Sequence, residues 1–158
     1  MPDSVRLQVL KAITDLIGTS TMLSQGSVYR GRLKFGVGDS LPRVSILESP
    51  KQGATNHPEG GADQKSIWEL YLQGFVVDEG DHPTDAAHDL LAEVKRLLVG
   101  MRIEESEFYR LPWLGEDLIY DVAIDGGICR PPDEFCNEAY FLLNVRLSLI
   151  EDLENPYG

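Results

Sequence analysis

The sequence has little of the chemistry that metal sites, disulfide frameworks and many catalytic centres need. Only two cysteines and three histidines occur among its 158 residues. No apolar run approaches the roughly 20 residues that cross a bilayer. The first residues lack the basic start and continuous apolar stretch of a signal peptide. We therefore expect neither membrane insertion nor secretion, and we expect the cysteines to be reduced thiols in a cytosol.

Basic residues are also scarce, and their distribution is uneven. The chain holds 14 Lys and Arg against 26 Asp and Glu, a formal net charge of −12. Residues 1–54 carry seven basic and four acidic residues, whereas the remaining 104 carry seven basic and 22 acidic. This balance argues against a domain that grips nucleic acid through its phosphates. Two interpretations stay open: an acidic surface that keeps the protein soluble, or a surface past which DNA moves without binding.

The length and the apolar content predict one domain that spans residues 1–158. Single domains usually contain about 100–200 residues. The 42% of hydrophobic residues is ordinary for a globular protein, and a chain of this length can bury a core without disulfides or metal.

Hydrophobic periodicity predicts an α+β fold. Apolar residues at spacings of three and four indicate helices over 5–17 and from about 84 to 101. Alternating patterns, bounded by Gly, Pro and Asp, indicate the strands; we place these at 28–34, 42–48, 66–78, 118–124 and 138–150. We expect a mainly antiparallel sheet with the helices packed on one face.

The connections are expected to be irregular. Residues 49–65 include two Pro and three Gly, and we interpret them as the tip of a long β-hairpin extension. A turn at 36–42 joins the first two strands. Residues 103–117 cross the core as a loop, a second loop ends near 134, and 151–158 form an acidic tail.

No catalytic residue, cofactor or metal site is predicted. His82 and His88 are six residues apart, which does not match the i, i+4 spacing of a helical metal pair. Six residues separate Cys129 from Cys136, unlike the Cys-x-x-Cys of zinc and redox sites, so free thiols are expected. We interpret Asp117, Asp121 and Asp125 as a solvated row.

Charged residues are the candidates for contacts with other subunits. Arg30, Arg32 and Lys34 alternate, so they would share one face of a strand. Two interpretations stay open: an edge protected from aggregation, or a surface that docks onto an acidic neighbour such as an identical subunit. The full set of interface candidates is Arg30, Arg32, Lys34, Lys51, His57, Glu59, Asp63, Lys65, Asp125, Asp133 and Glu134.

The order of these features resembles the tail terminator, or tail completion, proteins of long-tailed bacteriophages. The resemblance covers most of the chain and rests on five segments, none of them a chemical motif. They are the helix at 5–17, LPRVSI at 41–46, SIWELYLQGFVV at 66–77, DAAHDLL at 85–91 and FLLNVRL at 141–147. The 49–65 insertion and the 129–134 loop lie outside the shared pattern.

This resemblance implies a structural protein of the virion rather than an enzyme. It implies a homo-oligomeric ring, a hexamer, that caps the tail tube, ends tube polymerisation and docks the head connector, with assembly in the host cytoplasm. The partners would be identical subunits, the tube protein and the connector, and DNA would pass through the lumen without specific binding. The alternatives are another head–tail joining or neck adaptor, or a small cytosolic α+β ligand-binding domain or enzyme.

Overall fold

The fold is seen in a computed structural model of the chain. The residues that it describes are 2–36, 38–50, 52, 55–56, 63–100, 119–134 and 136–157. The elements, in chain order, are α1 (Val5–Gly18), β1 (Val28–Arg30), β2 (Arg43–Glu48), β3 (Thr55–Asn56), β4 (Asp63–Val76), α2 (Asp85–Val99), β5 (Ile119–Ile124), β6 (Ile128–Arg130) and β7 (Ala139–Asp152).

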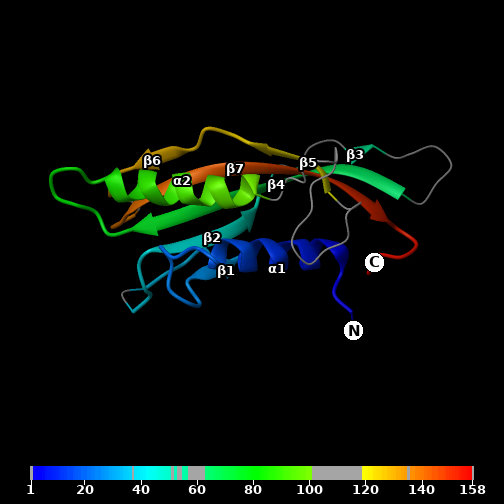
Figure 1. Ribbon diagram of the computed structural model, residues 1–158, viewed down its shortest axis with the longest axis horizontal. Helices are drawn as coiled ribbons and strands as arrows, with labels where there is room; N and C mark the ends of the chain where they lie inside the picture. Colours follow the sequence, from blue (N-terminus) through cyan, green and yellow to red (C-terminus); the bar gives the residue numbers. More distant parts are fainter. Residues whose placement is uncertain are drawn as a thin grey trace.

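Over the described residues, the chain forms an α+β sandwich of one sheet and two helices, as the periodicity predicts (Figure 1). The seven strands of the sheet run in the order β1-β2-β4-β7-β5, with β3 paired to β4 and β6 to β7. All pairs are antiparallel except β1 with β2. The long strands β4 and β7 are paired over their whole lengths, from Asp63 with Asp152 to Val76 with Ala139, and they lie at the centre of the sheet.

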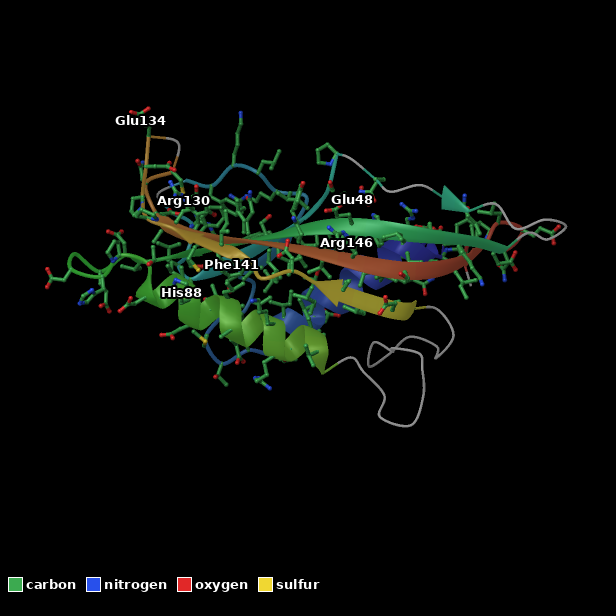
Figure 2. The ribbon with its side chains drawn as sticks, turned by 90° about the horizontal axis from the view of Figure 1, so that it is seen from above. Glu48, His88, Arg130, Glu134, Phe141 and Arg146 are labelled. Carbon is green, nitrogen blue, oxygen red and sulfur yellow. The ribbon has the colours of Figure 1, made fainter. Side chains whose placement is uncertain are left out.

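The core lies between the sheet and the helices. Alternate residues of the central strands are fully buried, and the register brings Trp68 opposite Leu147 and Leu72 opposite Leu143. α2 lies across β4 and β7, and α1 lies beside it against β1 (Figures 1 and 2). The buried stripe of α2 is the predicted one: Ala87, Leu90, Leu91, Val94, Leu97 and Leu98. The helices therefore cover one face of the sheet, as expected.

The first strand differs from the prediction in length and in direction. It ends at Arg30 rather than residue 34. Gly31 follows with φ 69°, a left-handed conformation that turns the chain away from the sheet. Val28 pairs in parallel with Val44, so residues 31–42 are a crossover connection and not the predicted turn at 36–42 between the two strands. The expectation that Arg30, Arg32 and Lys34 share one strand face is therefore wrong.

Two further segments need correction. Residues 128–130, expected to be part of a loop, form β6 on β7. The expected acidic tail begins later than 151, because β7 continues to Asp152. The chain then packs against α1, where Val5 N donates to Pro156 O at 2.9 Å. Arg6 Nε also pairs with Glu151 Oε1 at 2.9 Å, so the two ends of the chain lie together (Figure 1).

The predicted hairpin is seen in its two arms. β2 and β4 pair antiparallel, from Arg43 with Phe75 to Glu48 with Leu70, as the two arms of a hairpin. Of its expected tip, residues 49–50, 52, 55–56 and 63–65 are described. Two parts of it are strand and not loop as predicted, because Thr55–Asn56 pairs with β4 as β3 and β4 begins at Asp63. The predicted core-crossing loop at 103–117 lies outside the described residues.

Candidate functional site

The sheet face opposite the helices, here called the open face, is covered by no helix among the described residues. Its side chains alternate with the buried ones along each strand. They belong to Ile67, Glu69, Tyr71, Gln73 and Phe75 of β4 and to Tyr140, Leu142, Asn144 and Arg146 of β7. An antiparallel sheet can keep one face in water. This face nevertheless has an uncharged centre, where Tyr71 is paired with Asn144 and Gln73 with Leu142.

A loop folds back over one end of the open face. Residues 31–36, here called the Leu33 loop, are held by Arg32, whose Nη2 lies 2.8 Å from Asp39 Oδ2. The Arg32 guanidinium also stacks over the rings of Tyr29 and Phe35, at 4.9 and 4.7 Å from their centroids. The Gly36 N–H donates to Asp39 Oδ2, and this bond, with the charge of Arg32, lowers the pKa of the Asp39 carboxyl. The loop is therefore fixed in place by its own contacts.

Arg43 lies beneath this loop and is almost completely buried. Its side chain is 2% exposed. The guanidinium is sandwiched between Phe35 and Phe75, at 4.3 and 4.8 Å from their ring centroids. Its Nη2 pairs with Glu138 Oε2 at 2.5 Å, while its Nε has no hydrogen-bond partner among the described residues. A buried charge needs a partner, and Glu138 provides it here.

Two pockets open on this face. The first, here called the arginine pocket, has a volume of about 600 Å³ and lies between the Leu33 loop and residues 136–140. Its lining includes Lys34, Phe35, Arg43, Cys136 and Tyr140. Because it mixes apolar rings with charged groups of both signs, it suits a polar ligand or a side chain from another subunit.

The second pocket, here called the apolar pocket, has a volume of about 500 Å³. Tyr71, Ile128 and Leu142 contribute to its walls, and Asp125 lies on its lining. Asp125 Oδ1 accepts hydrogen bonds from Gly127 N at 3.0 Å and from Asn144 N at 3.3 Å. These bonds fix the turn before β6, so the carboxylate is held in one position.

Glycine is required at 127 in this turn. Its φ is 73°, and a Cβ there would lie 3.1 Å from the side chain of Leu91 and 3.2 Å from Leu142 O. The chain can therefore pass close to both α2 and β7 only because residue 127 has no side chain. This close approach places Ile128 at the mouth of the apolar pocket.

The structure separates the three basic residues Arg30, Arg32 and Lys34, which were predicted to share one strand face. Arg30 is exposed at the end of β1, and Lys34 is exposed on the Leu33 loop. Arg32, by contrast, is used inside the subunit by Asp39 and the aromatic rings. Of these three residues, only Arg30 and Lys34 thus keep their charged groups exposed for a partner.

The other predicted interface residues that the structure describes do not form one cluster. Lys65 is exposed near the start of β4, where Asp63 is the first residue. Asp133 and Glu134 are exposed in the loop before β7. Asp133 accepts hydrogen bonds from Cys136 N and the Tyr140 hydroxyl. The predicted residues Lys51, His57 and Glu59 lie outside the described residues.

Sequence reasoning missed Arg43, Phe35, Phe75 and Tyr140, which build the arginine pocket. One signal was present: Arg43 and Ser45 alternate with the apolar Val44 and Ile46 of β2, so they face the side opposite the core. That these two polar side chains are themselves buried depends on the Leu33 loop. Its path cannot be derived from the alternation.

The histidines and cysteines form no catalytic group in the described part of the chain. His82 and His88 are exposed around the start of α2, and His88 lies on the opposite side of the sheet from Glu134 (Figure 2). Cys136 Sγ donates to Glu138 O, whereas Cys129 packs against the core. Burial raises the pKa of both thiols. No group of three or more His, Cys, Asp or Glu suited to a metal ion occurs among the described residues.

No family model matches the chain, and no curated protein matches it. Within the described residues, none of the helices has both the length and the apolar character needed to span a membrane.

Proposed function

We propose that this protein is a structural subunit of a bacteriophage tail that forms a ring, caps the tail tube, stops its polymerisation and presents a docking surface to the head connector. The observation that carries the proposal is the open face. Its centre is uncharged, at Tyr71, Gln73 and Leu142, and charged residues surround this centre. An uncharged, partly aromatic centre within a charged rim is the usual anatomy of a protein–protein interface.

The element order adds support, because it follows the order on which the resemblance to tail terminator proteins depends. The acidic balance of the chain suits a channel for DNA, since phosphate groups would not adhere to an acidic lumen. The same features suit another head–tail joining or neck adaptor, which also binds subunits rather than substrates. We expect no catalysis in either case.

Electron microscopy of particles that lack the protein separates these roles. Without a terminator, tube polymerisation is not stopped, so tails are overlong or remain without heads. Without a closure protein, heads are formed but lose DNA. Particles with tails of normal length, attached to filled heads, would contradict both roles.

A small ligand-binding domain is the second candidate, and the arginine pocket is the observation in its favour. The pocket contains the buried Arg43, whose Nε has no hydrogen-bond partner among the described residues. The nearby Glu138 carboxylate offsets the charge of Arg43, so the pocket should bind small anions weakly. A rise of several degrees in melting temperature with a small carboxylate or phosphate at millimolar concentration would favour this function.

A further inference from the structure

The Leu33 loop exposes one leucine between two cations. Leu33 is 72% exposed, the largest value for a large apolar side chain among the described residues. Arg30 precedes it and Lys34 follows it, and both are exposed. A single exposed leucine is common on protein surfaces. This one differs because the segment that carries it is firmly anchored.

Four contacts anchor the loop around Leu33. Gly31 N donates to Ile46 O at 2.8 Å, and Ser45 Oγ donates to Arg32 O at 2.6 Å. Arg32 Nε donates to Lys34 O at 3.0 Å, and its Nη2 pairs with Asp39. A side chain held out by a rigid loop loses little backbone entropy when it enters a partner, which favours binding.

The apolar pocket has the properties that such a side chain requires. Tyr71, Ile128 and Leu142 offer apolar surface, and Ile128 is itself 55% exposed. The volume of about 500 Å³ accommodates a leucine side chain. Asp125 supplies a negative charge at the lining, and none of the ion pairs among the described residues involves it.

We infer that the Leu33 loop of one copy docks into the apolar pocket of a second copy, with Leu33 inside the pocket and Lys34 beside Asp125. The inference rests on the proposed function, because it requires copies of this chain to assemble. In its own chain Leu33 lines the arginine pocket and is not among the residues that line the apolar pocket, although Gln73 and Leu142 border both. The occupant we infer is therefore the Leu33 of a second copy. A contact between two different surfaces is the type that builds rings.

Native mass spectrometry of matched variants tests the contact. Leu33→Asp and Ile128→Asp should each reduce the assembly to single chains, because either change places an unpaired charge in the apolar contact. The milder Leu33→Ala should weaken each contact on the order of tenfold or more, the equivalent of about 1.4 kcal/mol or more. Leu153→Asp is the control and should leave the mass unchanged, because Leu153 is 55% exposed and directly follows the end of β7 that is far from Tyr140. Melting temperatures verify that each variant is folded.

A cross-link tests the pairing of the two surfaces directly. In chains with Cys129→Ala and Cys136→Ala, one preparation carries Leu33→Cys and the other carries Ile128→Cys. A disulfide forms only when the two Cα atoms come within about 4.4–6.8 Å of each other. Mild oxidation of the mixture should therefore join the two kinds of chain, while a mixture of Leu153→Cys with Ile128→Cys should not.

The outcomes separate this inference from the proposed function. If Leu33→Asp and Ile128→Asp keep the assembled mass of the parent and no cross-link forms, the docking of Leu33 into the apolar pocket is wrong. The proposed ring is not contradicted by that result. If the parent is a closed pair that Leu33→Asp dissociates and the cross-link forms, the contact holds and the ring is wrong. If the parent is a single chain at all concentrations, both are wrong.

Discussion

A methyl group added at Gly74 should test the packing of the core most sharply. Gly74 lies near the C-terminal end of β4, directly opposite Phe141 of β7. A Cβ at this position would lie 2.0 Å from Phe141 Cε1 and 2.6 Å from its Cδ1. Carbon atoms in contact normally lie about 3.5–4.0 Å apart, so the ring would have to move by more than 1 Å.

The Phe141 ring has little room to move. It is fully buried, and β4 and β7 are paired along their whole lengths on either side of it. Adding a methylene to a close-packed core costs about 1–3 kcal/mol and occasionally more. For a clash with an immobile ring we expect Gly74→Ala to lower the free energy of unfolding by about 3 kcal/mol. In a domain of this size that is a fall of about 6–12 °C in melting temperature.

Urea unfolding followed by far-UV circular dichroism measures this cost, and Phe141→Leu serves as the partner in a double-mutant cycle. Phe141→Leu alone should also destabilise, because it leaves a cavity. Combined with Gly74→Ala it removes the clash, so the double variant should lose at least about 1 kcal/mol less than the sum of the single losses. Gly18→Ala is the control, since a Cβ there meets nothing within 4 Å.

Two results would refute this reasoning. Gly74→Ala as stable as the parent would mean that the Phe141 ring does not occupy the space above Gly74. Strict additivity in the cycle would mean that the two positions do not compete for the same volume. Either result would place the register of β4 and β7 in doubt.

Three further predictions concern a buried ion pair, a carboxylate and the two thiols. Glu138→Ala should lower the free energy of unfolding by about 2 kcal/mol, measured by urea unfolding, because it leaves the buried Arg43 charge unpaired. Lys11→Ala removes the exposed pair with Asp3 and should change this free energy little. Equal losses in the two variants would contradict the burial of Arg43. The pKa of the Asp39 carboxyl is lowered in the folded protein, so its stabilising contribution is present above the pKa of the unfolded carboxyl and is lost as pH falls through the folded pKa. The difference in free energy of unfolding between the parent and Asp39→Asn should therefore shrink below about pH 4. A difference that grows on acidification would contradict the lowered pKa. The raised pKa of Cys129 and Cys136 predicts slow alkylation by iodoacetamide at pH 7.5 in the native protein and fast alkylation in guanidinium; rapid labelling of the native thiols would contradict their burial.

Long, regular patterns made most of the fold predictable. The stripe of α2 runs from Ala87 to Leu98, and β4 alternates without interruption from Trp68 to Leu72. Each pattern has several turns or repeats, so a single irregular residue does not change the result. The helix boundaries and the antiparallel pairing of β2 with β4 followed from the same signals and their flanking Gly, Pro and Asp residues.

Short elements and non-local pairings were not predictable in the same way. β6 has three residues, too few for an alternating pattern, and it exists because β7 offers Tyr140 to Leu142 as partners. The parallel pairing of β1 with β2 depends on a crossover of residues 31–42, and a connection of about a dozen residues is what such a crossover requires. The sequence pattern at 28–34 continued past Gly31, although the strand does not.

The candidate site was predicted in part for the same reason. Exposed charges such as Arg30, Lys34 and Asp125 are recognisable from the sequence because they need no particular neighbour. The arginine pocket is different, because Arg43 is buried only through contacts with Phe35, Phe75 and Glu138 from three other segments. Long-range contacts of this kind leave no periodic signal in a single sequence.

The native mass of the purified protein tests the central claim most directly. One chain has a mass of 17.6 kDa. The proposed ring predicts a species of six times this mass at micromolar concentration, and its dissociation as salt rises if the contact of Lys34 with Asp125 contributes. A mass of one chain under all of these conditions would contradict the proposal that this protein caps a phage tail as a ring.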